Sequence, residues 1–156
     1  MRRTALALVA VLIASFALAA CGSSGDSKPS TADYKKAWTP ISQEIKNIGA
    51  QIGGAVTTAK GKTDAELAGT FGGLATETTS TATSLAKLDP PADVKADQTA
   101  LVAALKVGAA DLQAISDAAT AGDPKKAGAA TVKLVEDSGA IKKSRVSIDA
   151  TVAKTS

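Results

Sequence analysis

The chain has 156 residues, with 18 lysines and arginines against 15 aspartates and glutamates, a single cysteine and no histidine. Without imidazole, and with one thiol, the usual zinc, copper and haem sites and every catalytic triad that depends on histidine are excluded. The near balance of charge gives no indication of a nucleic-acid partner, and neither a P-loop nor a dinucleotide-binding glycine motif is present. We therefore expect no metal and no cofactor.

The first twenty residues have the layout of an export signal. Arg2 and Arg3 supply a positive flank, and an apolar run from Ala5 to Ala20 follows. The run is shorter and richer in alanine than the ~20 apolar residues that a membrane-spanning helix needs, and small residues precede a cleavage site. We expect residues 1–20 to be a cleaved signal peptide, whose loss would leave 16 basic against 15 acidic side chains.

The signal ends in Leu18-Ala19-Ala20-Cys21, which resembles the lipobox of bacterial lipoproteins. In that family the cysteine carries a diacylglyceryl group and becomes the first residue of the mature protein. The resemblance implies that Cys21 is lipidated and that the protein is anchored to the extracytoplasmic face of the cell membrane. The alternative is an ordinary signal with an unrelated cysteine. Residues 22–30 are small and polar, so residues 21–30 are expected to form a lipidated cysteine and a flexible tether.

Apolar residues then recur at steps of three and four, which is typical of helices with one buried face. The predicted helices cover about residues 31–60, 64–88, 91–121 and 124–154. Within the first of these, Pro40 either follows a Thr39 N-cap or marks a kink.

The segment boundaries carry helix-start and helix-stop signals. Thr63 and Glu66 fit a capping box, and Pro90 ends the second segment because proline disfavours helix in the residue before it. Gly122 ends the third segment, and Asp123 is placed to cap the fourth ahead of a proline. Short turns between long helices predict an all-α fold, an antiparallel up-down-up-down four-helix bundle over residues 31–156.

The expected core is thin, because Leu, Ile, Val and Phe make up under a fifth of the chain after residue 20. The chain resembles the small alanine-rich helical lipoproteins of high-GC Gram-positive bacteria in its lipobox, its polar tether and the L-x-P-P turn at Leu88–Pro91. The resemblance supplies no functional residues to transfer.

Two groups of lysines mark the ends of the predicted bundle. At the end far from the anchor, the geometry gathers Lys60, Lys62, Lys125 and Lys126, either as solvated side chains or as a site for an anionic partner such as a wall polymer. At the near end, Lys35, Lys36, Lys142, Lys143 and Lys154 are placed to face lipid headgroups, with solubility as the alternative role.

Arg145 interrupts the apolar face of the fourth segment, level with Asp97 and Gln98 and at the same end as Trp38. A buried arginine needs a partner, so we expect a carboxylate contact or stacking on Trp38. The alternatives are that Trp38, Gln98 and Arg145 contact a ligand, or that Arg145 extends to water.

Three functions follow in order of expectation. The first is a non-enzymatic interaction or structural module of the cell envelope, with an envelope protein or wall polymer as partner. The second is a carrier of a small apolar ligand or lipid between the glycine-rich first and second helices, which a cavity lined by Ile48, Ile52, Phe71 and Leu74 would favour. The third is a carboxylate-based hydrolase, for which the candidate acids, mostly expected on solvated faces, are Glu44, Glu77, Asp97 and Asp111.

Overall fold

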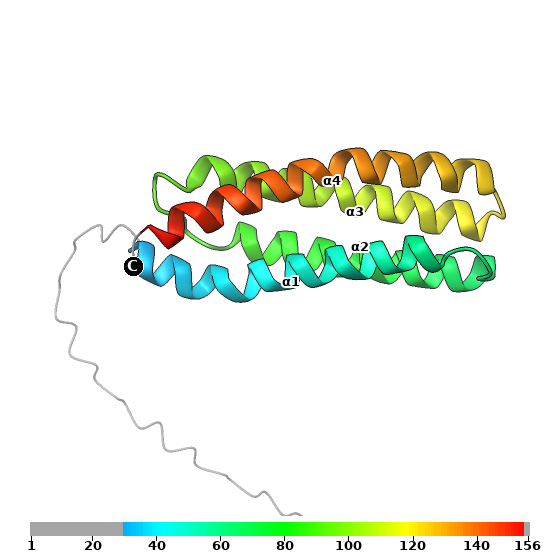
Figure 1. Ribbon diagram of the computed structural model, residues 1–156, viewed down its shortest axis with the longest axis horizontal. Coiled ribbons are helices and arrows are strands. Elements are labelled where there is room, and N and C mark those ends of the chain that lie inside the picture. The colour runs from blue at the N-terminus through cyan, green and yellow to red at the C-terminus, as the bar shows by residue number, and fades with distance from the viewer. Residues whose placement is uncertain (1–29, 155–156) are drawn as a thin grey trace, which may run out of the picture.

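The computed structural model describes residues 30–154, so the expected signal peptide, Cys21 and most of the tether lie outside the described residues. Four helices follow one another along the chain: α1 (Thr31–Thr58), α2 (Asp64–Ala86), α3 (Lys95–Thr120) and α4 (Pro124–Ala153). Figure 1 shows successive helices running in opposite directions along the long axis of the bundle, and no strand occurs between residues 30 and 154. The all-α four-helix bundle is confirmed.

Side-chain caps set three of the four helix starts. Ser30 accepts from the Asp33 amide at the start of α1, Thr63 and Glu66 form the capping box of α2, and Asp123 caps α4. The α1 helix therefore begins well before Pro40 and runs through it.

The α3 helix begins later than the sequence predicts, at Lys95 instead of residue 91. Residues 92–94 form a turn after the two prolines, in which the Val94 and Lys95 amides donate to the Pro91 carbonyl at 3.0 and 3.1 Å. This turn gives the chain room to reverse direction before α3 starts.

The core consists of two clusters, one in each half of the bundle. The cluster nearer the N-terminus contains Tyr34, Trp38, Ile41, Ile45, Ala82, Leu85, Val94, Leu101, Leu105, Ile148 and Val152. The cluster at the far end contains Phe71, Leu74, Ala75, Leu112, Ile115 and Leu134. Along each helix, most of these core residues follow one another at the steps of three and four that predict a buried face.

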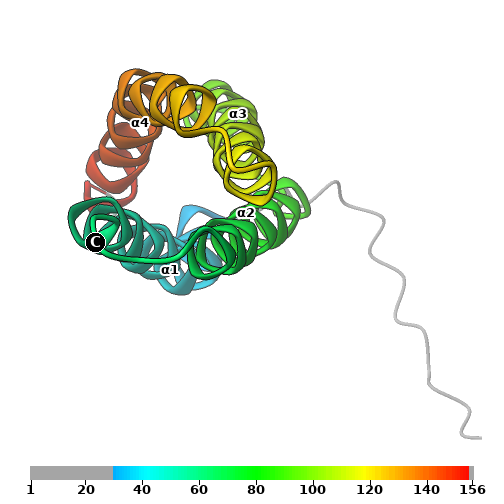
Figure 2. The same ribbon diagram turned by 90° about the vertical axis from the view of Figure 1, so that its right-hand side faces the viewer.

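Between the two clusters, the core contains few large apolar side chains. The buried positions there include Thr78 on α2 and Gly108 on α3, where larger apolar residues would fill a bundle core. The helix pairs α2–α3 and α3–α4 pack closely, whereas α1 and α4 approach each other at few points. Figure 2 shows the four helices arranged as a ring around this core.

Helix α3 is the most enclosed element. By length and composition it is the one helix within residues 30–154 that is apolar enough to cross a membrane. Half of its most apolar stretch is buried inside the bundle, as expected for a core helix packed against two neighbours.

Tyr34, the single tyrosine of the chain, makes a buried polar contact near the start of α1. Its hydroxyl donates to Gln98 Oε1 at 2.7 Å, and burial raises its pKa to about 12. Since the folded pKa lies above the ordinary value of 10.0, the associated stability is present below that pH and is lost as the pH rises toward 12. We expect tyrosinate absorbance of the native protein to titrate about two pH units above that of the denatured protein; equal midpoints would contradict this placement.

Candidate functional site

A groove lies between α1 and α4 at the thin level of the core. It encloses about 620 Å³, within the range of about 300–1,000 Å³ of small-molecule sites. Its floor consists of buried residues from all four helices, namely Ile45, Ile48, Thr78, Leu105, Gly108, Leu112 and Leu134. Its exposed rim includes Lys46, Gly49, Gly53, Val135, Gly139 and Lys142. We call this feature the α1–α4 groove.

Small residues on facing positions keep the groove open. A Cβ atom built at Gly49, Gly53 or Gly139 would meet no atom within 4 Å. At Gly108 a Cβ would lie 3.2 Å from Ile141 Cδ1, so the missing side chain lets Ile141 approach the floor. The groove therefore reflects both the missing side chains along its rim and the sparse packing between α1 and α4.

The groove differs in position from the predicted cavity. Ile48 and Ile52 line it as expected, but Phe71 and Leu74 are buried in the far core cluster. The prediction that α1 and α2 form the two walls of the cavity is therefore wrong for α2. The second wall of the groove comes from α4. The α2 glycines lie elsewhere: Gly72 packs against Ser116 of α3, and its built Cβ would lie 3.1 Å from Ser116 Oγ.

Asp149 of α4 forms a polar bridge across the seam beside the groove. Its Oδ1 accepts from Trp38 Nε1 at 2.8 Å and from Ser42 Oγ at 3.0 Å, both on α1. Its Oδ2 accepts from Arg145 Nη1 at 2.6 Å, one helical turn away. One carboxylate thus holds α1 and α4 together and neutralises a guanidinium that is 16% exposed.

The bridge shows how the predicted polar residues are arranged. Arg145 makes the expected carboxylate contact, but with Asp149, whereas Asp97 accepts from Ser147 at 2.6 Å. Trp38 stacks on Tyr34, with ring centroids 6.5 Å apart. Arg145 lines the groove, whereas Trp38 and Gln98 do not.

Gln98 has a structural role. Its Nε2 donates to the carbonyls of Leu85 and Leu88 at 3.0 and 2.9 Å, and its Oε1 accepts from Tyr34. These bonds hold the end of α2 and the start of α1 against α3. With its side-chain amide engaged in this way, Gln98 serves the turn between α2 and α3.

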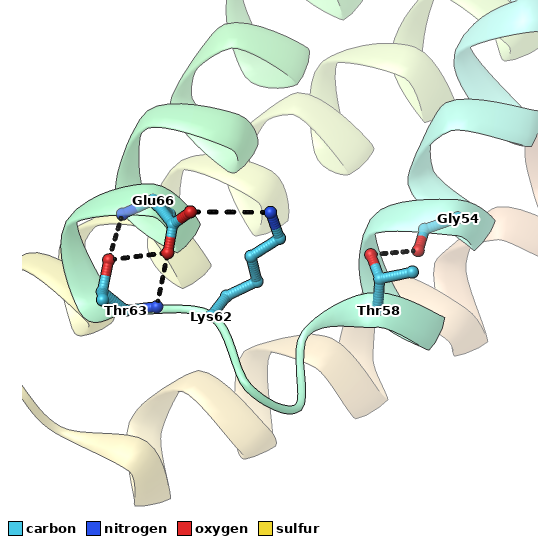
Figure 3. A network of polar contacts seen from close by, with 5 residues as sticks. All are labelled: Gly54, Thr58, Lys62, Thr63 and Glu66. Carbon is cyan, nitrogen blue, oxygen red and sulfur yellow. Dashed lines mark hydrogen bonds and ion pairs between the residues drawn. The ribbon is translucent and has the colours of Figure 1, made fainter.

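The far-end lysines share their end of the bundle with carboxylates. Lys62 Nζ lies 3.6 Å from Glu66 Oε1, within the capping network drawn in Figure 3, and Lys126 Nζ lies 3.3 Å from Asp123 Oδ2. Amide and lysine contacts lower the pKa of both carboxyls, so these groups stay ionised. Lys60 and Lys125 are exposed. The predicted cluster is thus a mixed-charge end instead of a purely basic one.

The predicted near-end lysines separate into two groups. Lys35 and Lys36 lie at the start of α1, beside the end of α4, and Lys154 caps that end. Lys142 lies about 17 Å further along α4 and lines the α1–α4 groove. The structure therefore separates Lys142 from Lys35, Lys36 and Lys154.

The carboxylates expected on solvated faces are less exposed than predicted. Glu44, Glu77 and Asp97 are half-buried, and Glu44 Oε1 accepts from Thr81 at 2.7 Å. Asp111 is 6% exposed. Its Oδ1 lies 3.2 Å from Lys133 Nζ, and its Oδ2 has no hydrogen-bond partner.

Asp111 is a source of instability at neutral pH. Burial raises its pKa, with a further rise from Asp137 and an opposing effect from Lys133. A raised folded pKa means that the protonated form is favoured on folding, so stability falls as the pH rises from below 3.8 through the folded value. We expect Asp111→Asn to stabilise the protein by about 1 kcal/mol at neutral pH and to have no effect at acidic pH.

Urea denaturation at the two pH values measures this prediction. The matched variant is Asp137→Asn, whose carboxyl has its pKa lowered by Lys133. That variant should lose stability at neutral pH, because a lowered folded pKa contributes stability only while the group is ionised. A destabilised Asp111→Asn protein at neutral pH would contradict the argument.

The α1–α4 groove thus combines an apolar floor, an open rim and three cationic side chains, and no carboxylate lines it. Such a surface offers apolar contact and positive charge to a ligand. Comparisons with protein-family models, with curated proteins and with solved structures find no match for this chain.

Proposed function

We propose that the protein is a membrane-anchored lipoprotein of the extracytoplasmic face, held by lipid on Cys21, that binds a small apolar ligand or lipid in the α1–α4 groove. The proposed role is non-enzymatic. The sequence before residue 30 supports the anchor through its lipobox and polar tether. The membrane is the partner of the lipid anchor on Cys21. Binding a small apolar ligand requires no further protein partner.

The observation that carries the binding function is the groove itself. Its volume is about 620 Å³, and its floor is almost wholly apolar. Apolar surface left open to water is unfavourable by about 25 cal/mol per Å². A protein with so few large apolar residues would gain stability from side chains at Gly49, Gly53 and Gly139, where space is free. Their absence supports a site kept open for a ligand.

Exposed valines on α4 favour a second candidate function, a contact surface for another envelope protein. Val132, Val135 and Val146 are 61%, 63% and 48% exposed, and their spacing places them along one side of the helix. Val135 also belongs to the groove rim. A partner bound there would cover the groove opening, so the two functions are compatible.

Native mass spectrometry of the full-length protein purified from membranes tests the proposal. The expected spectrum contains the diacylglyceryl-modified mature chain and a second population with one additional lipid mass. A lipid mass that is released by gentle collisional activation is a bound ligand, whereas the anchor stays attached. A spectrum containing the modified chain alone, from membranes that were not delipidated, would reject the ligand.

A further inference from the structure

From the charges around the α1–α4 groove we infer that its ligand is a single-chain amphiphile with an anionic head, and this inference rests on the proposed function. Three cationic side chains line the groove: Lys46 of α1, and Lys142 and Arg145 of α4. No carboxylate is among the lining residues. Because Asp149 neutralises Arg145, the net attraction for an anionic head comes from Lys46 and Lys142.

The three cations gather at one end of the groove. The bond from Ser42 to Asp149 fixes the register of the two antiparallel helices. One helical turn from that bond toward the far end of the bundle, Lys46 of α1 lies level with Arg145 of α4. Lys142 lies three residues from Arg145, on the same side of α4. The head site thus has one wall from each helix.

Of these three cationic side chains, only Arg145 forms an ion pair within the described residues. Lys46 and Lys142 are exposed and form no ion pair with any residue of the 30–154 segment. Arg145 donates one N–H group to Asp149, and a guanidinium carries five. All three side chains therefore retain donors for a carboxylate or phosphate oxygen.

The other end of the groove is uncharged. Ile52, Val56, Leu134 and Val135 line it. From Lys46 to Val56 the groove extends about 15 Å along α1, which is half of the ~30 Å hydrocarbon core of a bilayer and thus the reach of one lipid chain. The chain would point to the far end of the bundle, and the head would lie between Lys46 and Lys142.

Photocrosslinking of the full-length protein in isolated membranes tests this inference. Three probes carry the same diazirine near the end of a hexadecyl chain: the fatty acid, the alkyl phosphate and the neutral alcohol. Peptide mapping by mass spectrometry should place the crosslinks of both anionic probes on α1 near Val56 and on α4 near Leu134. Anionic probes should label these peptides about tenfold more than the alcohol. Whichever anionic probe labels more strongly identifies carboxylate or phosphate as the natural head.

Charge variants provide the control. Lys46→Gln combined with Lys142→Gln should reduce labelling by the anionic probes to the level of the alcohol. The matched pair, Lys36→Gln with Lys143→Gln, removes the same charge from the same helices outside the groove lining and should leave labelling unchanged. Equal labelling by all three probes would overturn the anionic head but leave the apolar site of the proposed function. Absence of labelling on α1 and α4 with every probe would overturn the proposed function as well.

Discussion

Replacing Asp149 with alanine is expected to lower the free energy of unfolding by about 2–3 kcal/mol. Removing one partner of a buried ion pair costs about 3–5 kcal/mol, and Asp149 is 34% exposed, which reduces the effect. The variant leaves Trp38 Nε1 without its acceptor and Arg145 without its counter-charge. For a domain of this size the melting temperature should fall by roughly 6–12 °C.

Two further variants distinguish the contributions of Asp149. Asp149→Asn keeps an oxygen for Trp38 and Ser42 but removes the charge that faces Arg145, so it should cost less than alanine. Asp117→Ala removes an exposed carboxylate that accepts from Gln113 one turn away on α3, and should change stability by less than about 0.5 kcal/mol. Thermal unfolding followed through Trp38, the single tryptophan, measures all three. Equal melting temperatures for the Asp149→Ala and Asp117→Ala proteins would contradict a bridging role.

Local signals in the sequence predict most of the fold. Spacing of apolar residues by three and four gives the buried faces of all four helices, and the caps at Thr63 and Asp123 depend only on neighbouring residues. Such signals are encoded within one helical turn. The start of α3 was placed too early because the turn after Pro91 satisfies backbone groups that a helix would otherwise use.

The position of the groove could not be predicted in the same way. Which helix pair separates depends on small residues that face each other from distant parts of the chain, here Gly49 and Gly53 of α1 and Gly139 of α4. Ser138 has a core position in the spacing of α4, yet it is exposed at the groove. Asp149 was missed because it lies beside the apolar face, although its spacing of four from Arg145 is an ion-pair signal.

Filling the groove should abolish ligand binding while stabilising the protein. Gly53→Leu combined with Gly139→Leu places two leucines at nearly the same level on facing helices, where added Cβ atoms meet nothing within 4 Å. Each replacement removes a helical glycine, a gain of about 0.8 kcal/mol, and contact between the leucines adds to it. We expect at least about 2 kcal/mol of added stability and a tenfold or greater loss of bound lipid.

The matched variant replaces Gly73 and Gly128 with leucine. Both are exposed helical glycines with free space at the Cβ position, and neither lines the groove. Their gain in helix propensity should raise stability without any loss of bound lipid. The comparison therefore distinguishes a binding site from an unfilled core. A protein substituted at both Gly53 and Gly139 that unfolds at a higher temperature yet retains its lipid would place the ligand elsewhere. Opposite effects on stability and binding would mean that the open rim between α1 and α4 is maintained for its occupant at a cost to the fold.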